Sequence, residues 1–388
     1  MAERRILDGV QVLDFTHVVA GPYATRVLAD LGARVTKVDP LPPDGAEGPV
    51  RGSGSASNNA GKRSIALDLR VPAGTDVAAR LAARADVLVE NFRPGVMARL
   101  GLAYEQLREA NPRLVFASIS GFGQSGASSH RRAYGATAHA EAGWLWVQQQ
   151  AAGFDAPFAP GITVADIVTA SNAVSAILAA LYDREHTGRG QHIDVTLVES
   201  QLAMLSEVAG PALAGDSEAE WRPFRHPIHA ARDGHVTINL GGPRNWQRIA
   251  EALGHPDEEM PPTPAEANAA VGSWVAGHDV ADLARRMEEA GAPYGIVRSM
   301  REAVSDPYFA ERGMVVRLDD PLDGKLTVIG SPLHFSDAVT GPAAAAPLAG
   351  EHSRQVLRDL GCDDAEVRSL LESRSVVQQD PPHTPSGP

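Results

Sequence analysis

The amino-acid sequence predicts an α/β protein built on a parallel β-sheet, and three observations support this fold class. Within the first 200 residues, short apolar runs alternate with segments of helical spacing. The runs are rich in Val, Leu and Ile, as in strands that are buried on both faces. The segments between them have the length of roughly 10–15 residues that is typical of crossover helices. This alternation favours parallel βαβ units.

The first βαβ unit occupies the N-terminal part of the chain. VQVLDF (10–15) is a short apolar strand, the segment 22–33 has its apolar residues on one helical face, and RVTKVD (34–39) is the next strand. The turn THVVAGP contains one glycine, whereas the dinucleotide-binding fingerprint has three that admit the pyrophosphate. Pro22 instead suits the first position of a helix. We therefore expect no dinucleotide at this turn.

The rest of the large domain continues the alternation. A long helix is expected from about Asp166 to Glu185, because its apolar residues recur at intervals of three and four, and the glycines of HTGRGQ end it. Further elements are strands at 64–69, 86–92 and 114–120, an extended run at 192–200 and a helix near 73–84.

Length and a change of texture predict two domains. A chain of 388 residues exceeds what one compact core usually holds. At 221–232 the alternation gives way to WRPFRHPIHAARDG, which we interpret as the crossing into a smaller α+β domain. The predicted organisation is a large domain (1–220), a small domain (221–325), a C-terminal return to the large domain (326–375) and a Pro-rich disordered tail (376–388).

Composition limits the partners of this protein. The net charge of −13 argues against a nucleic-acid or anionic-membrane surface, although a local basic cluster can still hold a polyanionic small ligand. The single cysteine, Cys362, excludes a disulfide framework and a cysteine-based zinc site, and we expect no metal. We find neither a signal-peptide pattern nor a run of roughly 18 apolar residues, so we expect a cytoplasmic protein without a membrane span.

Candidate ligand-binding residues follow the predicted strands. In VENFRPGVMARLGL, Asn91 and Phe92 end a buried strand, and Arg93 and Arg99 come after it. Ligands of α/β sheets bind at the carboxyl ends of the strands. An aromatic side chain and two arginines there suit stacking on a purine and pairing with phosphates. The glycine-rich loop ISGFGQSG (119–126) permits close approach of a ligand, although ordinary tight turns have the same composition.

Asp166 lies where the periodicity of the long helix begins, in APGITVADIVTASNAV. A carboxylate at this place is a natural N-cap, and most aspartates there have no other role. The same place favours an ionised, hydrogen-bonded carboxylate. In a desolvated site such a carboxylate can act as a nucleophile. The residues alone leave both interpretations open.

A series of ordered motifs resembles one family over about residues 5–370. The motifs include FTHVVAGPYATRVLADLGARVTKVD, NNAGKRSIALDL, DVLVENFRPGVMARLGL, NPRLVFASISGFGQSG and HTGRGQHIDVTLVES. They are similar to those of family III CoA-transferases, a group that includes formyl-CoA transferase, carnitine CoA-transferases and α-methylacyl-CoA racemase. The resemblance implies a Rossmann-like large domain formed by both chain ends, a small central domain and an interlocked homodimer.

The resemblance also implies a reaction. CoA moves from an acyl-CoA donor to a carboxylic acid acceptor through an aspartyl-CoA thioester, so CoA is a substrate and no tightly bound cofactor is expected. Asp166 matches the nucleophile of the transferases, and the backbone N–H groups of Gly241 and Gly242 are candidate oxyanion donors. The CoA contacts of the family map onto Val18, Val19, Leu67, Arg70, Asn91, Phe92, Arg99 and Leu100.

Departures from the family pattern leave alternatives open. The racemases pair the aspartate with a histidine, but here Tyr134 aligns with that histidine and His139 lies five residues later. The catalytic-site glutamate of formyl-CoA transferase maps to Ala136, so the group that assists the nucleophile is undefined. The alternatives are an α-methylacyl-CoA racemase or isomerase that abstracts the α-proton, and a catalytically silent CoA-binding homologue. Tyr134 and His139 are candidate substrate residues, and Arg131 and Arg132 are candidates for holding an acceptor carboxylate.

Overall fold

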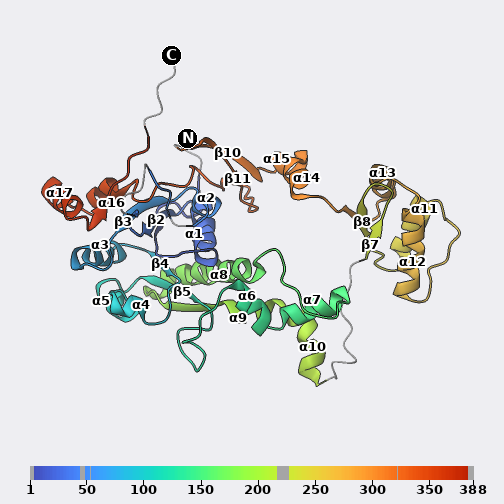
Figure 1. The fold of residues 1–388 in the computed structure, drawn as a ribbon, viewed down its shortest axis with the longest axis horizontal. Coiled ribbons are helices and arrows are strands. Elements are labelled where there is room, and N and C mark those ends of the chain that lie inside the picture. Colours follow the sequence, from blue (N-terminus) through green and yellow to red (C-terminus); the bar gives the residue numbers. More distant parts are fainter. Residues whose placement is uncertain (1–3, 44–48, 53, 216–226, 321, 383–388) are drawn as a thin grey trace, which may run out of the picture. The chain divides into compact units, whose positions relative to one another are not determined.

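The chain folds as two units in the computed structural model, which describes residues 4–43, 49–52, 54–215, 227–320 and 322–382 (Figure 1). The first unit combines Met1–Ala219 with Ala310–Pro388, and the second is Glu220–Phe309. The predicted boundary at 325/326 therefore moves to 309/310. The reason is that β10 (Val315–Asp320) and β11 (Gly324–Ile329) form a hairpin that Arg51 anchors through Asp320 (Nη2–Oδ1 2.7 Å).

The first, large unit contains a seven-stranded sheet. Its strands are β1 (Gln11–Asp14), β2 (Arg34–Asp39), β3 (Arg63–Leu67), β4 (Val87–Glu90), β5 (Val115–Ser120), β6 (His192–Thr196) and β12 (Val376–Val377). The order is β12-β3-β2-β1-β4-β5-β6. The predicted parallel sheet is confirmed, because β1 to β6 run parallel and β12 alone is antiparallel. The order 3-2-1-4-5-6 is that of a Rossmann fold, in which the strand order reverses between β1 and β4.

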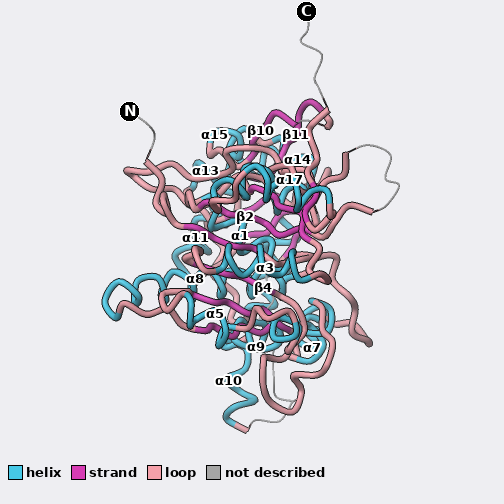
Figure 2. The backbone as a smooth tube through the Cα atoms, turned by 90° about the vertical axis from the view of Figure 1, so that its left-hand side faces the viewer, coloured by secondary structure: helices cyan, strands magenta, loops and turns pink. Residues whose placement is uncertain are grey.

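Helices cover both faces of this sheet (Figure 2). They include α1 (Ala20–Asp30), α3 (Pro72–Ala82), α8 (Val164–Thr187), α16 (Ser353–Asp359) and α17 (Asp364–Glu372). Neighbouring residues of a strand point to opposite faces. Val12 of β1 accordingly belongs to a core with α1 and α8, whereas Leu13 belongs to a second core with α3, α16 and α17.

α8 has 24 residues and is apolar enough, by length and composition, to cross a membrane (mean hydropathy 1.7). The sequence had predicted no segment of this kind. In α8, 44% of the apolar window is buried, and Ala170, Ala173 and Ile177 belong to the core against the sheet. The core helix of a soluble protein passes the same test, so α8 is weak evidence for a membrane span.

Two segments differ from the sequence predictions. The extended run expected at 192–200 stops at Thr196, and α9 (Leu197–Met204) follows, because Thr196 Oγ1 accepts the N–H of Glu199 (2.9 Å) and caps a helix. The tail expected at 376–388 begins as strand β12, which pairs with β3 and accepts a hydrogen bond from Ser353 Oγ at the carbonyl of Val377 (2.6 Å). Residues 383–388 lie outside the described residues.

The second unit is an α+β arrangement. The strands β7 (Ile228–Ala230), β8 (His235–Ile238) and β9 (Tyr294–Ile296) form an antiparallel sheet in the order β7-β8-β9. Its helices include α11 (Pro243–Ala252), α12 (Pro264–Val275) and α13 (Val280–Ala290), which contribute Trp246, Val271 and Met287 to its core.

The other helices in the described part of the chain are short. They are α2 (Ala56–Asn59), α4 (Val96–Arg99), α5 (Tyr104–Ala110), α6 (Gly135–Glu141), α7 (Trp144–Ala152), α10 (Ser206–Ala214), α14 (Met300–Ser305) and α15 (Pro307–Glu311).

A fully buried ion pair lies inside the large unit, between Lys62 Nζ and Asp14 Oδ2 (3.0 Å). Burial opposes ionisation of Asp14, but the charges of Lys37 and Lys62, with hydroxyl hydrogen bonds, hold the pKa of this carboxyl well below its usual range. Burial lowers the pKa of Lys62 to about 8. Lys62 Nζ also donates to Thr25 Oγ1 (2.8 Å), Asn59 Oδ1 (2.9 Å) and the carbonyl of Pro22 (3.0 Å).

Glu90, at the end of β4, makes stability depend on pH. Burial raises the pKa of Glu90 from 4.5 to about 7, so the stability that this group contributes is full below pH 4.5 and is lost as the pH rises through 7. Gln is neutral and can still accept the N–H of Phe92. We expect Glu90→Gln to raise the melting temperature by about 2–4 °C at pH 8 and to leave it near wild type at pH 4.5. Thermal melts at both pH values check this, and equal shifts would contradict it.

Candidate active site

A cavity of about 270 Å³ lies at the carboxyl ends of the strands in the large unit. It is lined by 17–20 after β1, by 91–94 after β4, by 119–121 at the end of β5, and by 131–134 together with Asp166. Because β1 and β4 flank the reversal of strand order, the cavity occupies the switch point at which Rossmann-type sheets bind ligands. The glycine-rich loop singled out in the sequence thus contributes to the site.

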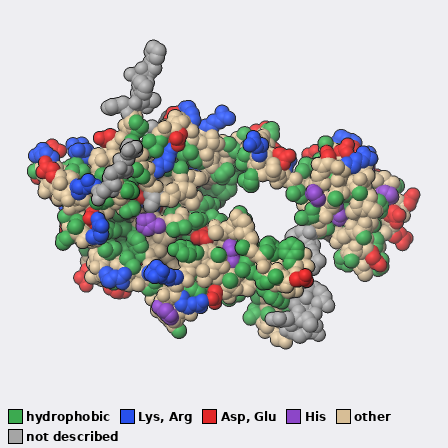
Figure 3. Space-filling model, in the orientation of Figure 1, with side chains coloured by type: hydrophobic (Ala, Val, Ile, Leu, Met, Phe, Trp, Pro, Cys, Tyr) green, Lys and Arg blue, Asp and Glu red, His purple; other side chains and the backbone are tan. Residues whose placement is uncertain are grey.

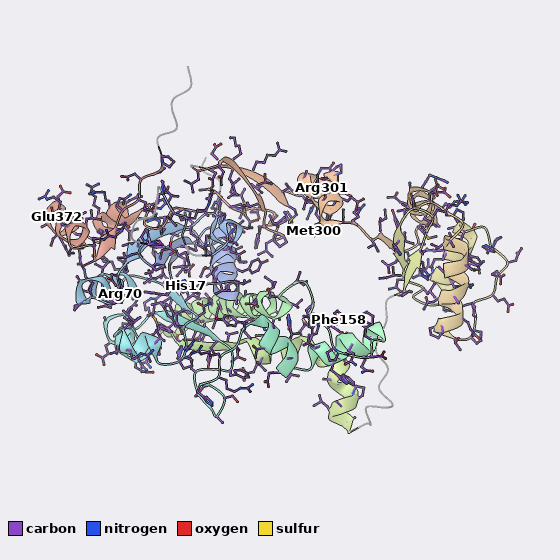
Figure 4. The ribbon with its side chains drawn as sticks, viewed as in Figure 1. His17, Arg70, Phe158, Met300, Arg301 and Glu372 are labelled. Atoms are coloured by element: carbon purple, nitrogen blue, oxygen red, sulfur yellow. The ribbon has the colours of Figure 1, made fainter. Side chains whose placement is uncertain are left out.

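A second cavity, of about 400 Å³, adjoins the first. His17 and Phe92 line both cavities, and their ring centroids are 5.5 Å apart. The second cavity is also lined by Leu67 and Arg70, two of the predicted CoA contacts. Figure 4 labels His17 and Arg70, which come from the segments after β1 and β3. The two cavities together form an extended site that suits a long ligand, with Asp166 in one part and Arg70 in the other.

Asp166 is the third residue of α8, so the predicted N-cap is wrong: Thr163 occupies the cap position. The Asp166 side chain is buried and lines the first cavity. Burial raises the pKa of Asp166, and hydrogen bonds from its own N–H and from the N–H of Ala20 partly offset the rise. Ala20 begins α1. The carboxylate therefore lies at the N-termini of two helices, whose dipoles favour negative charge.

Gly135, the first residue of α6, leaves the space that this carboxylate occupies. A Cβ atom at position 135 would lie 2.2 Å from Asp166 Oδ2 and 3.2 Å from Thr163 Cβ. A separation of 2.2 Å is a severe clash, so any side chain at position 135 displaces the carboxylate or the start of α6. This glycine was not predictable from the sequence, because its neighbour Asp166 is 31 positions away in the chain.

Gly135→Ala tests this arrangement. We expect it to lower kcat about 100-fold or more, because a displacement of about 1 Å at a reacting group costs roughly that factor. Gly161→Ala is the matched control, since a Cβ at Gly161 meets no atom within 4 Å. Steady-state kinetics of both folded variants check the prediction. Equal activity of the two variants would show that the carboxylate tolerates the added methyl group.

His139 is buried and does not line either cavity. Its Nε2 accepts the N–H of Ala165 (3.1 Å), which is one of the donors that the first turn of α8 leaves unsatisfied. The His139 ring packs against Trp144, with the ring centroids 4.5 Å apart. Burial lowers the pKa of His139, and its bond to Ala165 uses the lone pair of the neutral ring. In the structure His139 therefore caps the helix that carries Asp166 and lies outside the cavity lining, and its predicted contact with substrate stays a prediction.

The other candidate substrate residues line the first cavity. Tyr134 is 69% exposed there, and Arg131 and Arg132 lie beside it. The guanidinium of Arg131 pairs with Glu141 and lies 4.3 Å from the ring centroid of Phe122. Arg132 is exposed at the cavity and has no ion pair among the described residues. Arg132 is therefore the arginine of this pair that is available to a ligand anion.

Several predicted CoA contacts group together and others do not. Val18, Val19, Asn91 and Phe92 line the first cavity. Arg99 and Leu100 line neither cavity, and Leu100 packs against a core of the large unit. Gly241 (φ 52°) and Gly242 (φ 107°) belong to the second unit and follow β8. The structure does not test their role as oxyanion donors, which stays a prediction. Among the described residues, no three His, Cys, Asp or Glu side chains gather as metal ligands.

The residue that sequence reasoning missed in this cavity is His17. Its signal was its place in the turn THVVAGP, directly after a predicted strand. Phe92 was identified for its aromatic ring, and the same criterion applied to the turn after β1 would have found His17, whose ring lies beside that of Phe92.

In Figure 3, basic and acidic side chains are interspersed over the visible face of the large unit, in keeping with a local rather than a broad anion-binding surface.

A buried carboxylate beside a cavity at the switch point of a Rossmann-type sheet is an arrangement that suits an α/β enzyme. The model of CoA-transferase family III matches residues 7–353, and the chain belongs to that family. Succinyl-CoA:glutarate CoA-transferase of Homo sapiens is 33% identical over 97% of this chain and 91% of its own length. Formyl-CoA:oxalate CoA-transferase of Streptomyces coelicolor is 32% identical over 96% of this chain and 99% of its own length. A CAIB/BAIF family protein from Brucella suis has a TM-score of 0.78 at 28% identity, over 92% of this chain and 100% of its own. The predicted class, an acyl-CoA:carboxylate CoA-transferase, is confirmed.

Proposed function

We propose that this protein transfers CoA through a covalent thioester on Asp166. The carboxylate attacks the thioester carbonyl of the donor, which forms a mixed anhydride and releases CoA thiolate. The thiolate then attacks the aspartyl carbonyl, which frees the donor acid and leaves aspartyl-CoA thioester. The acceptor carboxylate attacks the aspartyl carbonyl, which forms a second mixed anhydride and releases CoA thiolate. The thiolate then attacks the acyl carbonyl of the acceptor, which yields the new acyl-CoA and frees Asp166. An activated acyl bond, either thioester or anhydride, is kept at every step, so the site must exclude water that would hydrolyse it.

One observation carries this proposal: the buried carboxylate of Asp166 opens into the switch-point cavity. Its burial removes water that would shield a nucleophile. It lies at the N-terminal ends of α8 and α1, whose dipoles favour its ionised form. Gly135 leaves the carboxylate its space. A carboxylate that served only as a helix cap would not need either the cavity or the glycine.

Trapping the intermediate tests the proposal. Wild type is incubated with succinyl-CoA as the probe and quenched with hydroxylamine, which attacks the aspartyl carbonyl, releases CoA and leaves a hydroxamate. We expect peptide mass spectrometry to find the hydroxamate at position 166. The Asp166→Asn variant, treated identically, is the control. Active wild type that is modified nowhere would contradict the covalent route.

The racemase alternative needs a second base on the other side of the α-carbon. Tyr134 occupies the aligned position, and His139 accepts the N–H of Ala165 outside the cavity. These two residues therefore offer no histidine base to a substrate in the cavity. Incubation of a 2-methylacyl-CoA in D₂O without any acid should leave its α-proton in place, and exchange of that proton would favour the racemase. A silent homologue would give neither exchange nor transfer with any acid.

We propose that Arg132 holds the acceptor through a carboxylate. The relatives named above act on glutarate and oxalate, both of which carry a second carboxylate. A guanidinium at the cavity pairs with such a group in a bidentate manner. We expect Arg132→Ala to raise the KM of glutarate about 10–100-fold with little change in the KM of succinyl-CoA.

The matched variant is Arg131→Ala. Because Arg131 is already paired with Glu141, its removal should raise the KM of glutarate several-fold less than removal of Arg132. Initial rates at varied glutarate measure both values. An equal rise for the two variants would assign the acceptor to neither arginine in particular.

We further propose that the protein is an interlocked cytoplasmic homodimer. Support comes from an exposed, uncharged stripe on α8 formed by Ile167, Ser171, Ser175, Ala179 and Tyr182. Both serine hydroxyls donate to helix carbonyls, to those of Ile167 (3.0 Å) and Ser171 (2.9 Å), so the stripe presents little free polarity. Such a surface suits a partner, here a second copy of the chain. Light scattering should give about twice 40.9 kDa, and a mass of 40.9 kDa would contradict the dimer.

A further inference from the structure

Val18 has a backbone conformation that β-branched residues rarely adopt. Its φ is 70°, and Arg374 is the other non-glycine residue with positive φ in the described chain. This region disfavours a branched Cβ, and the surrounding structure must hold a residue there. Val18 lines the cavity and is 57% exposed, so tight packing of its own side chain does not supply that restraint. The restraint must come from its neighbours in the chain.

The amide of Asn91 supplies such a restraint one residue before Val18. The N–H of His17 donates to Asn91 Oδ1 (2.8 Å), and Asn91 Nδ2 donates to the carbonyl of His17 (2.7 Å). Both polar ends of the side chain thus bind one residue of backbone, as a neighbouring strand would. Asn91 follows β4 directly, so this pair of bonds ties the turn to the sheet across the switch point.

A second set of bonds fixes the turn one residue earlier. The N–H of Thr16 donates to Asp14 Oδ1 (2.8 Å), and Lys37 Nζ donates to its carbonyl (2.5 Å). Positions 16 and 17 are therefore held on both backbone groups, and Val18 is the first residue that is free to turn. Two residues later, Ala20 begins α1 and lines the same cavity as Asp166.

We propose that Asn91 is a positioning residue for the nucleophile: by clamping His17 it holds Val18 in the left-handed conformation and keeps the start of α1 at Ala20 in place beside Asp166 in the first cavity. This inference rests on the proposed covalent role of Asp166. It gives Asn91 a task other than the predicted contact with CoA, since one Oδ1 lone pair and one Nδ2 proton are already used on His17. A residue that contacted CoA alone would need neither bond.

The two roles predict different kinetics. If Asn91 positions Asp166, Asn91→Ala lowers kcat about 10–100-fold and slows hydroxamate formation at position 166 to a similar extent. If Asn91 only binds CoA, the KM of succinyl-CoA rises and kcat is unchanged. Asn111→Ala is the matched control, because Asn111 Nδ2 also donates to backbone carbonyls, those of Ala82 (3.2 Å) and Ala85 (2.7 Å), away from both cavities. Its kcat should equal that of wild type.

A double-mutant cycle with Val18→Gly tests the link to backbone strain. Glycine adopts positive φ without strain and needs no clamp. In the Val18→Gly background, Asn91→Ala should therefore lower kcat less than about 5-fold, against 10–100-fold in the presence of Val18. If Asn91→Ala does not fold, Asn91→Asp replaces it, since it keeps the Oδ1 acceptor and loses the donor to the His17 carbonyl. Equal losses of kcat in both backgrounds, or a rise in the KM of succinyl-CoA with kcat unchanged, would overturn the proposal.

The order of measurements separates this inference from the proposed function. If wild type transfers CoA but gives no adduct at Asp166, the covalent mechanism itself fails. If wild type gives the adduct and Asn91→Ala forms it at the wild-type rate, the mechanism stands and the positioning role of Asn91 is wrong.

Discussion

Asp166→Ala is expected to lower kcat for CoA transfer by roughly 10⁴-fold or more, because removal of a covalent nucleophile leaves only binding and orientation to accelerate the reaction. The KM of succinyl-CoA should change little, since the extended site that reaches Arg70 stays intact. Steady-state kinetics with succinyl-CoA and glutarate measure both values. Retention of more than about a tenth of the wild-type kcat is incompatible with Asp166 as the nucleophile.

The pH dependence of the wild type adds an independent check. Asp166 must be ionised to attack, and burial raises its pKa, so kcat/KM should fall with decreasing pH at a value above the ordinary pKa of aspartate. The same shift has the opposite consequence for stability. Stability contributed by Asp166 is full below the unfolded pKa and is lost as the pH rises through the folded pKa.

Asp166→Asn separates activity from stability. Because the variant removes a buried charge at neutral pH, it should melt at least as high as wild type there while losing activity. This advantage should shrink as the pH falls and the wild-type carboxyl becomes protonated. A variant that loses both activity and melting temperature at pH 7 would point to a structural role for Asp166.

Lys62→Met is expected to destabilise the protein by about 3–5 kcal/mol, the largest stability effect that the structure implies. The change leaves Asp14 buried without its closest counter-charge, although Lys37 remains as a second positive neighbour. It also removes the donor to Asn59 Oδ1 and to the carbonyl of Pro22. Urea unfolding followed by circular dichroism measures the free energy of unfolding.

A surface ion pair provides the control for this measurement. Lys325 pairs with Asp319 at an exposed position of the β10–β11 hairpin, so Lys325→Met should cost less than about 1 kcal/mol. The double variant Asp14→Leu/Lys62→Met should recover part of the loss, because a buried ion pair can be replaced by apolar groups at small cost. Similar free energies of unfolding for Lys62→Met and Lys325→Met would show that the buried pair contributes little.

The strands of the large sheet were largely predictable from the sequence. Arg34–Asp39 was predicted at its observed bounds, and the other parallel strands lie within the expected ranges or one residue outside them. Strands such as β4 (VLVE) and β5 (VFASIS) are buried along their whole length and mostly apolar, so they can be recognised without knowledge of their neighbours. The extended run at 192–200 was predicted too long, since the cap formed by Thr196 is a local signal that competes with an apolar pattern.

The candidate site was only partly predictable. Asn91, Phe92 and the loop at 119–126 were found because ligands bind at the carboxyl ends of parallel strands. Gly135 was missed, because its need for glycine comes from Asp166, 31 positions later in the chain. The contact of His139 with the N–H of Ala165 was not predictable, because sequence spacing does not show which group meets the ring's lone pair.

The sequence by itself determined the α/β class, the parallel sheet and the resemblance to the family, because each depends on patterns repeated along the chain. Only the tertiary structure decided what the site residues do. It showed that Asn91 clamps His17, that His139 caps α8, that Arg131 is already paired, and that Asp166 faces a cavity. These roles rest on hydrogen bonds and clashes between residues far apart in the chain. Such contacts exist only after folding brings the ends of β1, β4 and α8 together.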